Sequence, residues 1–155
     1  MSREVESFRR FVFSTIEELV DSLEGLSEEQ LNWRAAGADT NSLYAIAMHV
    51  LGNAEENILS TLCVVPVQRT RAEEFASHGR TWEPVRDRWR GLRERIEAAL
   101  VNLPLADLDR ERKHPRRGML TEREILLVVA RHAAEHWGEA QLTRNLLKAR
   151  QGAES

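Results

Sequence analysis

Two histidines spaced four residues apart are the part of this sequence best suited to chemistry. His132 and His136 occur in the stretch RHAAEHWGEAQ, inside a long predicted helix. With about 100° of rotation per residue, they fall in the same apolar stripe as Ile125, Val129 and Thr143. Imidazoles in a core need partners, and one helix can supply two of them to a single zinc-sized ion. Two histidines hydrogen-bonded within the core would give the same pattern.

A third histidine, His49, occurs in SLYAIAMHVLGNAEEN on another predicted helix. It falls on the flank of the apolar arc, in a line of small and polar residues that would leave room for a ligand. The alternative for His49 is a half-exposed surface histidine. The two remaining histidines, His78 and His114, are expected in loops and share no helical phase with the others.

Glu139 is predicted in the same buried stripe as the first two histidines, three residues past His136. A carboxylate in that position is costly unless it is paired. Glu139 is therefore a candidate for orienting a ligand histidine through a hydrogen bond, for acting as a base, or for binding the metal itself. The alternative is that the helix exposes this turn at an open end of the protein.

Four amphipathic helices are predicted to position these side chains. Apolar residues recur at helical spacing behind N-capping residues such as Ser42 and Thr121, and glycine or proline follows. The four helices are expected over about residues 3–24, 42–63, 81–103 and 122–148. No alternating β-branched run predicts a strand. The fold class is therefore all-α, a four-helix bundle in which the long connections over 64–81 and 104–120 permit crossovers.

Composition narrows the class of protein. The 155 residues suit one domain, which we place at 1–150, followed by a frayed tail at 151–155. The net charge of −3 gives no indication of a nucleic-acid partner or a membrane surface. Cys63 is the single cysteine, the N-terminus lacks the apolar core of a signal peptide, and no apolar run is long enough to span a membrane. We expect a cytoplasmic protein.

Two stretches of this sequence resemble the DinB/YfiT-like superfamily of bacterial metal-binding four-helix bundles. NSLYAIAMHVLGNAEEN is similar to the family's second helix, which carries a ligand histidine, and TEREILLVVARHAAEHWGEAQLTRNLL is similar to its last helix, with H-x-x-x-H followed by R-G-Q. GLSEEQLNWRAAG also looks like the family's link between the first two helices. The resemblance covers nearly the whole chain and implies a metal triad of His49, His132 and His136. It departs from the family where Trp137 replaces the arginine and Glu139 replaces the glutamine.

The resemblance also implies a function class. Characterised members include a mycothiol-dependent maleylpyruvate isomerase and bacillithiol transferases, so we expect a divalent metal, zinc or nickel, and a low-molecular-weight thiol as cosubstrate. The predicted activity is a transferase or isomerase acting on a small molecule. The alternative is a non-catalytic metal-binding or stress-related bundle. In either case a homodimer is expected, for which Trp137, predicted to point outward, is a candidate contact.

Two further patterns have weaker interpretations. HAAEH formally fits the inverted zinc-protease motif, with Glu135 as the base, but only 19 residues follow His136 to supply a further ligand. The stretch RERKHPRR, residues 110–117, carries five basic residues and one acid. It could attract the carboxylates of a thiol cosubstrate, although most such runs are simply solvated.

Overall fold

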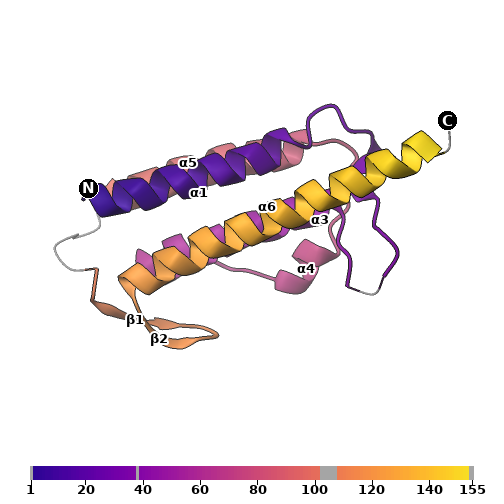
Figure 1. The fold of residues 1–155 in the computed structure, drawn as a ribbon. Coiled ribbons are helices and arrows are strands. Elements are labelled where there is room, and N and C mark those ends of the chain that lie inside the picture. The colour runs from indigo at the N-terminus through magenta and orange to yellow at the C-terminus, as the bar shows by residue number, and fades with distance from the viewer. Residues whose placement is uncertain (1, 38, 102–107, 154–155) are drawn as a thin grey trace.

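The part of the chain described in the computed structural model, residues 2–37, 39–101 and 108–153, is mostly helical, as predicted. Figure 1 shows the long helices α1 (Arg3–Asp21), α3 (Leu43–Ala54), α5 (Glu83–Val101) and α6 (Glu122–Ala153). The shorter elements are α2 (Glu28–Asn32), the π-helical segment η1 (Glu55–Leu62), α4 (Arg71–Phe75), β1 (Glu111–His114) and β2 (Gly118–Thr121).

A single hydrophobic core lies between the long helices. Helices α1 and α3 each pack against both α5 and α6. The predicted stripes supply this core: Val85, Trp89 and Ile96 of α5 are all buried, as are Ile125 and Val129 of α6. The apolar periodicity therefore identified correctly which face of each helix turns inward.

The helices begin at the capping residues that the sequence indicates. The Ser42 hydroxyl accepts a hydrogen bond from the Ala45 amide at the start of α3, at 3.2 Å. At the start of α6, the Thr121 amide donates to the Glu124 carboxylate at 2.7 Å, and the Glu124 amide donates back to the Thr121 hydroxyl at 3.2 Å. These caps fix where the two histidine-bearing helices start.

The second predicted helix consists of α3 continued by η1. In this segment the hydrogen bonds span five residues, and the Cys63 amide donates to the Ile58 carbonyl at 2.9 Å. Short π-helical stretches inside α-helices are frequent at functional sites. Here the π-helical segment carries Glu56 and Asn57, which both take part in the site described below.

The prediction that the chain has no strands was wrong. Segment 104–120, expected as a loop, contains the antiparallel β1–β2 hairpin, in which His114 pairs with Gly118. Gly118 has a φ of +77°, which glycine adopts without strain and which closes the turn. The strands are only four residues long and mostly polar, so they carry no alternating apolar pattern.

Helix boundaries also differ from those predicted. Helix α1 ends at Asp21, followed by turns to Gly25, and α6 continues to Ala153. Residues 151–153, expected as part of a frayed tail, are therefore helical. The connection over 64–81 contains the short helix α4.

Helix α4 and the hairpin lie on the same side of the α3–α6 pair (Figure 1). Helix α4 packs on α3, β1 packs on η1, and β2 packs on α6. The two connections thus cover the helices that carry the histidines. Among the described helices, none is both long and apolar enough to cross a membrane.

Candidate metal centre

The three histidines converge between α3 and α6. The candidate ligand nitrogens of His49, His132 and His136 all lie within 4.8 Å of one another. His49 Nε2 is 3.0 Å from His132 Nε2, and the rings of His132 and His136 are 4.4 Å apart between centroids. His49 is only 2% exposed, so the alternative of a half-exposed surface histidine was wrong. A single ion could contact all three side chains.

His49 is held in place by a carboxylate from α4. Its Nδ1 lies 2.9 Å from Glu74 Oε2, so the ring donates there and presents Nε2 to the other histidines. Burial lowers the pKa of His49 below its ordinary value, although Glu74 opposes this effect. Gly52 makes room for the carboxylate, because a Cβ on Gly52 would lie 1.8 Å from Glu74 Oε1. The small residues beside His49 thus make room for Glu74.

Glu74 belongs to a buried network of alternating charges. Arg69 donates to Glu74 through Nε at 2.7 Å and through Nη2 at 2.8 Å, and it also donates to Glu56 at 2.9 Å. Glu56 is paired in turn with Arg116 on the hairpin turn. Burial alone would raise the pKa of Glu74, but hydrogen bonds from Arg69 and His49 lower it. The carboxylate therefore stays ionised and keeps its bond to His49.

Glu139 plays the equivalent part for His136. The Glu139 Oε2 atom lies 2.6 Å from His136 Nδ1. The Glu139 Oε1 atom accepts a hydrogen bond from the side-chain Nδ2 of Asn41 at 3.2 Å. The hydrogen bond with His136 lowers the pKa of Glu139, which keeps it ionised. Of the roles left open for Glu139, the geometry supports the one that orients a ligand histidine.

His132 lies in surroundings that strongly disfavour its charged form. Burial, together with the proximity of His136 and His49, lowers its pKa to about 2. It is therefore a neutral imidazole over the whole physiological range, the form in which histidine binds a metal. The facing Nε2 atoms of His49 and His132, 3.0 Å apart, are the atoms that an ion would contact.

The remaining sequence candidates lie elsewhere. Glu135 is exposed and paired with Arg131 at 3.3 Å, away from the histidines, so the protease motif has no base in the site. Trp137, which was predicted to point outward, is half-buried: it packs partly against the core and also lines a surface pocket with Gln141 and Lys148. His78 is exposed in a loop.

His114, expected in a loop, is a buried residue of β1 that the sequence analysis missed. Its Nδ1 accepts from the Arg116 amide at 3.1 Å, and its Nε2 donates to Asn57 Oδ1 at 2.9 Å. Both ring nitrogens are therefore used within the protein, which leaves none for a metal. His114 instead forms part of the wall of the site.

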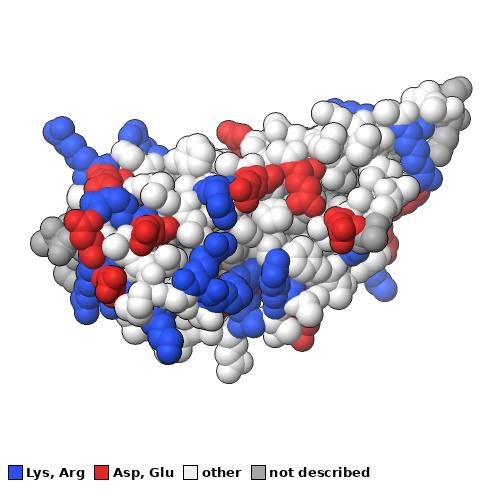
Figure 2. Space-filling model, turned by 60° about the horizontal axis from the view of Figure 1, so that its bottom comes forward, with Lys and Arg blue, Asp and Glu red and all other residues white. Residues whose placement is uncertain are grey.

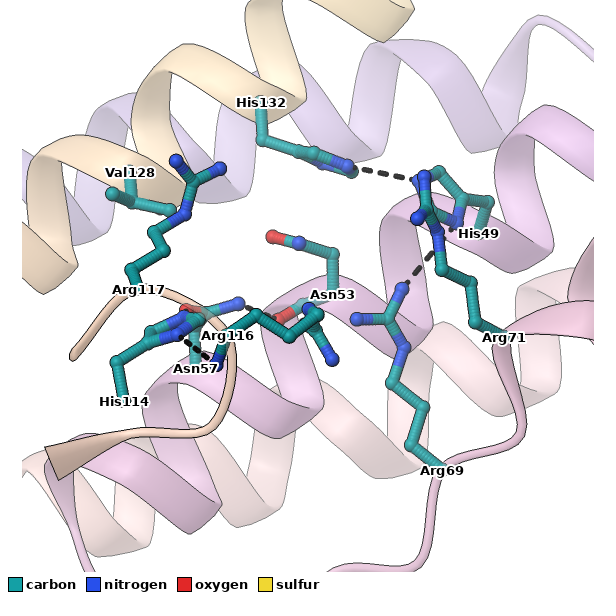
Figure 3. A pocket seen from close by; sticks show the side chains of 10 residues that line it. All are labelled: His49, Asn53, Asn57, Arg69, Arg71, His114, Arg116, Arg117, Val128 and His132. Carbon is teal, nitrogen blue, oxygen red and sulfur yellow. Dashed lines mark hydrogen bonds between the residues drawn. The ribbon is translucent and has the colours of Figure 1, made fainter.

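A cavity of about 270 Å³ opens beside the histidines (Figure 3). It is lined by His49, Asn53, Asn57, Arg69, Arg71, His114, Arg116, Arg117, Val128 and His132. No carboxylate lines it among the described residues. On this face of the molecule, basic side chains gather near the centre (Figure 2). Two of the three histidines, His49 and His132, therefore face a positively charged cavity.

The sequence contained one signal for this wall. His49, Asn53 and Asn57 follow one another at intervals of four, and both asparagines are buried. A polar line of that kind predicts a ligand or a network. Glu74, by contrast, lies 25 residues from His49 in a polar connection that carries no such signal.

Comparison with models of known protein families shows which family this chain belongs to. The family model of the DinB superfamily matches residues 14–140. The chain belongs to the DinB superfamily. The match spans α3 and reaches past Glu139, so it contains all three histidines, and it confirms the resemblance seen in the sequence. A search of curated proteins finds no match.

Within this DinB-superfamily chain, the two departures from the family pattern have different structural consequences. Trp137 adds to the core packing, whereas Glu139 contacts His136 directly. A glutamine in that position would accept the same hydrogen bond without bringing a negative charge. Two carboxylates, Glu74 and Glu139, thus lie against two of the three clustered histidines.

Proposed function

We propose that the protein binds one divalent metal ion, zinc or nickel, through His49, His132 and His136. The donor set fits such an ion. Three imidazoles converge on one side, and carboxylates behind two of them, Glu74 behind His49 and Glu139 behind His136, fix the tautomer. Metal-binding histidines in proteins are commonly held in this way, by a carboxylate that accepts a hydrogen bond from the other ring nitrogen. Three protein ligands with an open side are typical of catalytic rather than structural sites.

We further propose that the site serves a transferase or isomerase reaction that uses a low-molecular-weight thiol. The observation that carries this proposal is the open face of the triad toward the cavity. A bound divalent ion would lower the pKa of a thiol or water placed there. In this chain Glu74 and Glu139 would hold the ligands, and Asn53 would offer a hydrogen bond to whatever occupies the cavity.

The chain's own thiol does not supply the nucleophile. Cys63 does not line the cavity, and burial raises its pKa to about 11. It therefore remains a neutral thiol at physiological pH. A thiol that reacts in this site would have to come from a cosubstrate.

We also propose the crossover four-helix topology for the superfamily domain. Helices α1 and α3 each contact α5 and α6, so consecutive long helices α5 and α6 sit on opposite sides of the core. The connection between η1 and α5, which contains α4, then delivers Glu74 to His49. In this topology the long connections complete the site.

The test uses Co²⁺-loaded protein, because a thiolate that binds cobalt produces a charge-transfer absorption band. Cysteine, glutathione, coenzyme A, mycothiol and bacillithiol are titrated in turn. We expect at least one to produce the band in the wild type and none to do so in His132→Ala. If none binds or is turned over by the metal-loaded wild type, the thiol-dependent function is wrong and a non-catalytic metal protein is the better description.

A further inference from the structure

The cavity beside the triad contains two arginines with no carboxylate partner within the described chain. Arg69 and Arg116 are both tied to Glu56, and Arg69 also to Glu74. Arg71 forms no such pair, and its guanidinium lies over the Phe75 ring, 5.4 Å from the centroid. Arg117 likewise has no ion pair among the residues described. Two cationic groups in this cavity are therefore uncompensated.

These two side chains enter the cavity from different elements. Arg117 extends from the hairpin turn and Arg71 from the start of α4, on opposite sides of the space that the histidines face (Figure 3). The Phe75 ring under Arg71 also stacks on His49, with 4.3 Å between centroids. One of the unpaired guanidinium groups thus lies over a ring that packs on a candidate metal ligand.

A buried amide between them also lacks a partner. Asn53 is 8% exposed, lines the same cavity, and its Oδ1 makes no hydrogen bond within the described structure. Exchanging its oxygen and nitrogen would leave the same amide facing the cavity. Buried polar atoms are rarely left unsatisfied, so this side chain points to a ligand that is polar as well as charged.

We propose that this cavity is a binding subsite for a small molecule with a carboxylate or phosphate group, held by Arg71 and Arg117 and hydrogen-bonded by Asn53. The proposal rests on the proposed function, since it places the anionic group of a reactant beside the metal. Guanidinium groups are the side chains best suited to such oxyanions. The group belongs either to the thiol itself or to the second substrate.

Three matched probes separate these sources. They are 3-mercaptopropionate, 3-mercapto-1-propanol, in which a neutral hydroxymethyl group replaces the carboxylate, and propionate, which lacks the thiol. Each is titrated into Co²⁺-loaded protein by calorimetry, with the cobalt–thiolate band recorded in parallel. The variants are Arg71→Gln/Arg117→Gln and, as a control, Arg90→Gln, which removes an exposed charge outside the cavity. Cobalt content and melting temperature verify that each variant is folded.

We expect the wild type to bind 3-mercaptopropionate about ten-fold more tightly than the alcohol. The double variant should lose this preference, and Arg90→Gln should keep it. If the anionic group belongs to the second substrate, propionate and 3-mercapto-1-propanol will bind to the wild type at the same time. Propionate will then bind to the double variant at least several-fold more weakly than to the wild type.

The proposed subsite is contradicted if the wild type shows neither a preference for 3-mercaptopropionate nor any binding of propionate. It is also contradicted if the preference and the propionate binding are both unchanged in the double variant. A cobalt–thiolate band with the neutral thiol would then leave the proposed function intact. Arginine-dependent propionate binding with no thiolate band would instead support the subsite and contradict the thiol chemistry. If the double variant does not fold, salt titration of the wild type decides, because the preference should fall as ionic strength rises.

Discussion

Gly52 gives the sharpest prediction about how the site is built. A Cβ at this position would lie 1.8 Å from Glu74 Oε1 and 2.6 Å from Glu74 Cδ. Because both atoms belong to the carboxylate that holds His49, Gly52→Ala must push Glu74 away from the ring. Loss of such an outer-shell partner typically costs 10- to 100-fold in metal affinity, which is about 1.4–2.8 kcal/mol.

The same substitution should destabilise the metal-free protein. Overpacking a well-packed interior costs about 1–3 kcal/mol. Gly91 in α5 is a matched control, because a Cβ there would meet nothing within 4 Å. Gly91→Ala should gain up to about 1 kcal/mol from its higher helix propensity. The two variants should therefore differ by about 1–4 kcal/mol in their free energies of unfolding.

The assay combines chemical denaturation of metal-free protein with competitive zinc titration of the folded protein. Gly52→Ala should lower the stability and weaken zinc binding, whereas Gly91→Ala should leave zinc binding unchanged. If Gly52→Ala binds zinc as tightly as the wild type, Glu74 does not position His49 in the way described. The interpretation of Gly52 as the space for Glu74 would then be wrong.

Three further predictions concern single residues. Glu139→Gln should weaken zinc binding by less than Glu139→Ala, because the amide still accepts from His136, and equal losses in the two variants would contradict an orienting role. Burial, with Arg116 and Arg117, lowers the pKa of His114 below its ordinary value of 6.5. The contribution of His114 to the free energy of unfolding is therefore complete above pH 6.5 and is lost as the pH falls below that value. Denaturation of metal-free protein between pH 7.5 and 5 should show a steeper loss in the wild type than in His114→Gln, and parallel curves would refute this. Cys63→Ser should leave any thiol-dependent turnover unchanged. Loss of turnover in this variant would show that the buried Cys63 thiol takes part.

Local periodicity was enough to predict the inner part of the site. The spacing of His132 and His136 and their shared phase with Val129 follow from helix geometry alone. The same reasoning placed Glu139 in their stripe, and the structure pairs it with His136. The weaker phase of His49 understated its burial, because the phase of one helix does not show which neighbours cover its flank.

Elements from the long connections could not be predicted in this way. Glu74 and Arg71 reach the site on a five-residue helix, and Arg117 on the turn of a mostly polar hairpin. Neither element has an apolar face with a period of its own, and both are positioned by packing on α3, η1 and α6. The basic stretch at residues 110–117 could be recognised, but not the fact that two of its arginines face the histidines.

The central claim is that His49, His132 and His136 hold one metal ion. Elemental analysis of purified wild type, His49→Ala and His132→Ala tests it most directly, with Arg90→Gln as the control. We predict about one equivalent of zinc or nickel per chain in the wild type and the control, and little or none in either histidine variant. Full metal occupancy in both histidine variants would contradict the claim.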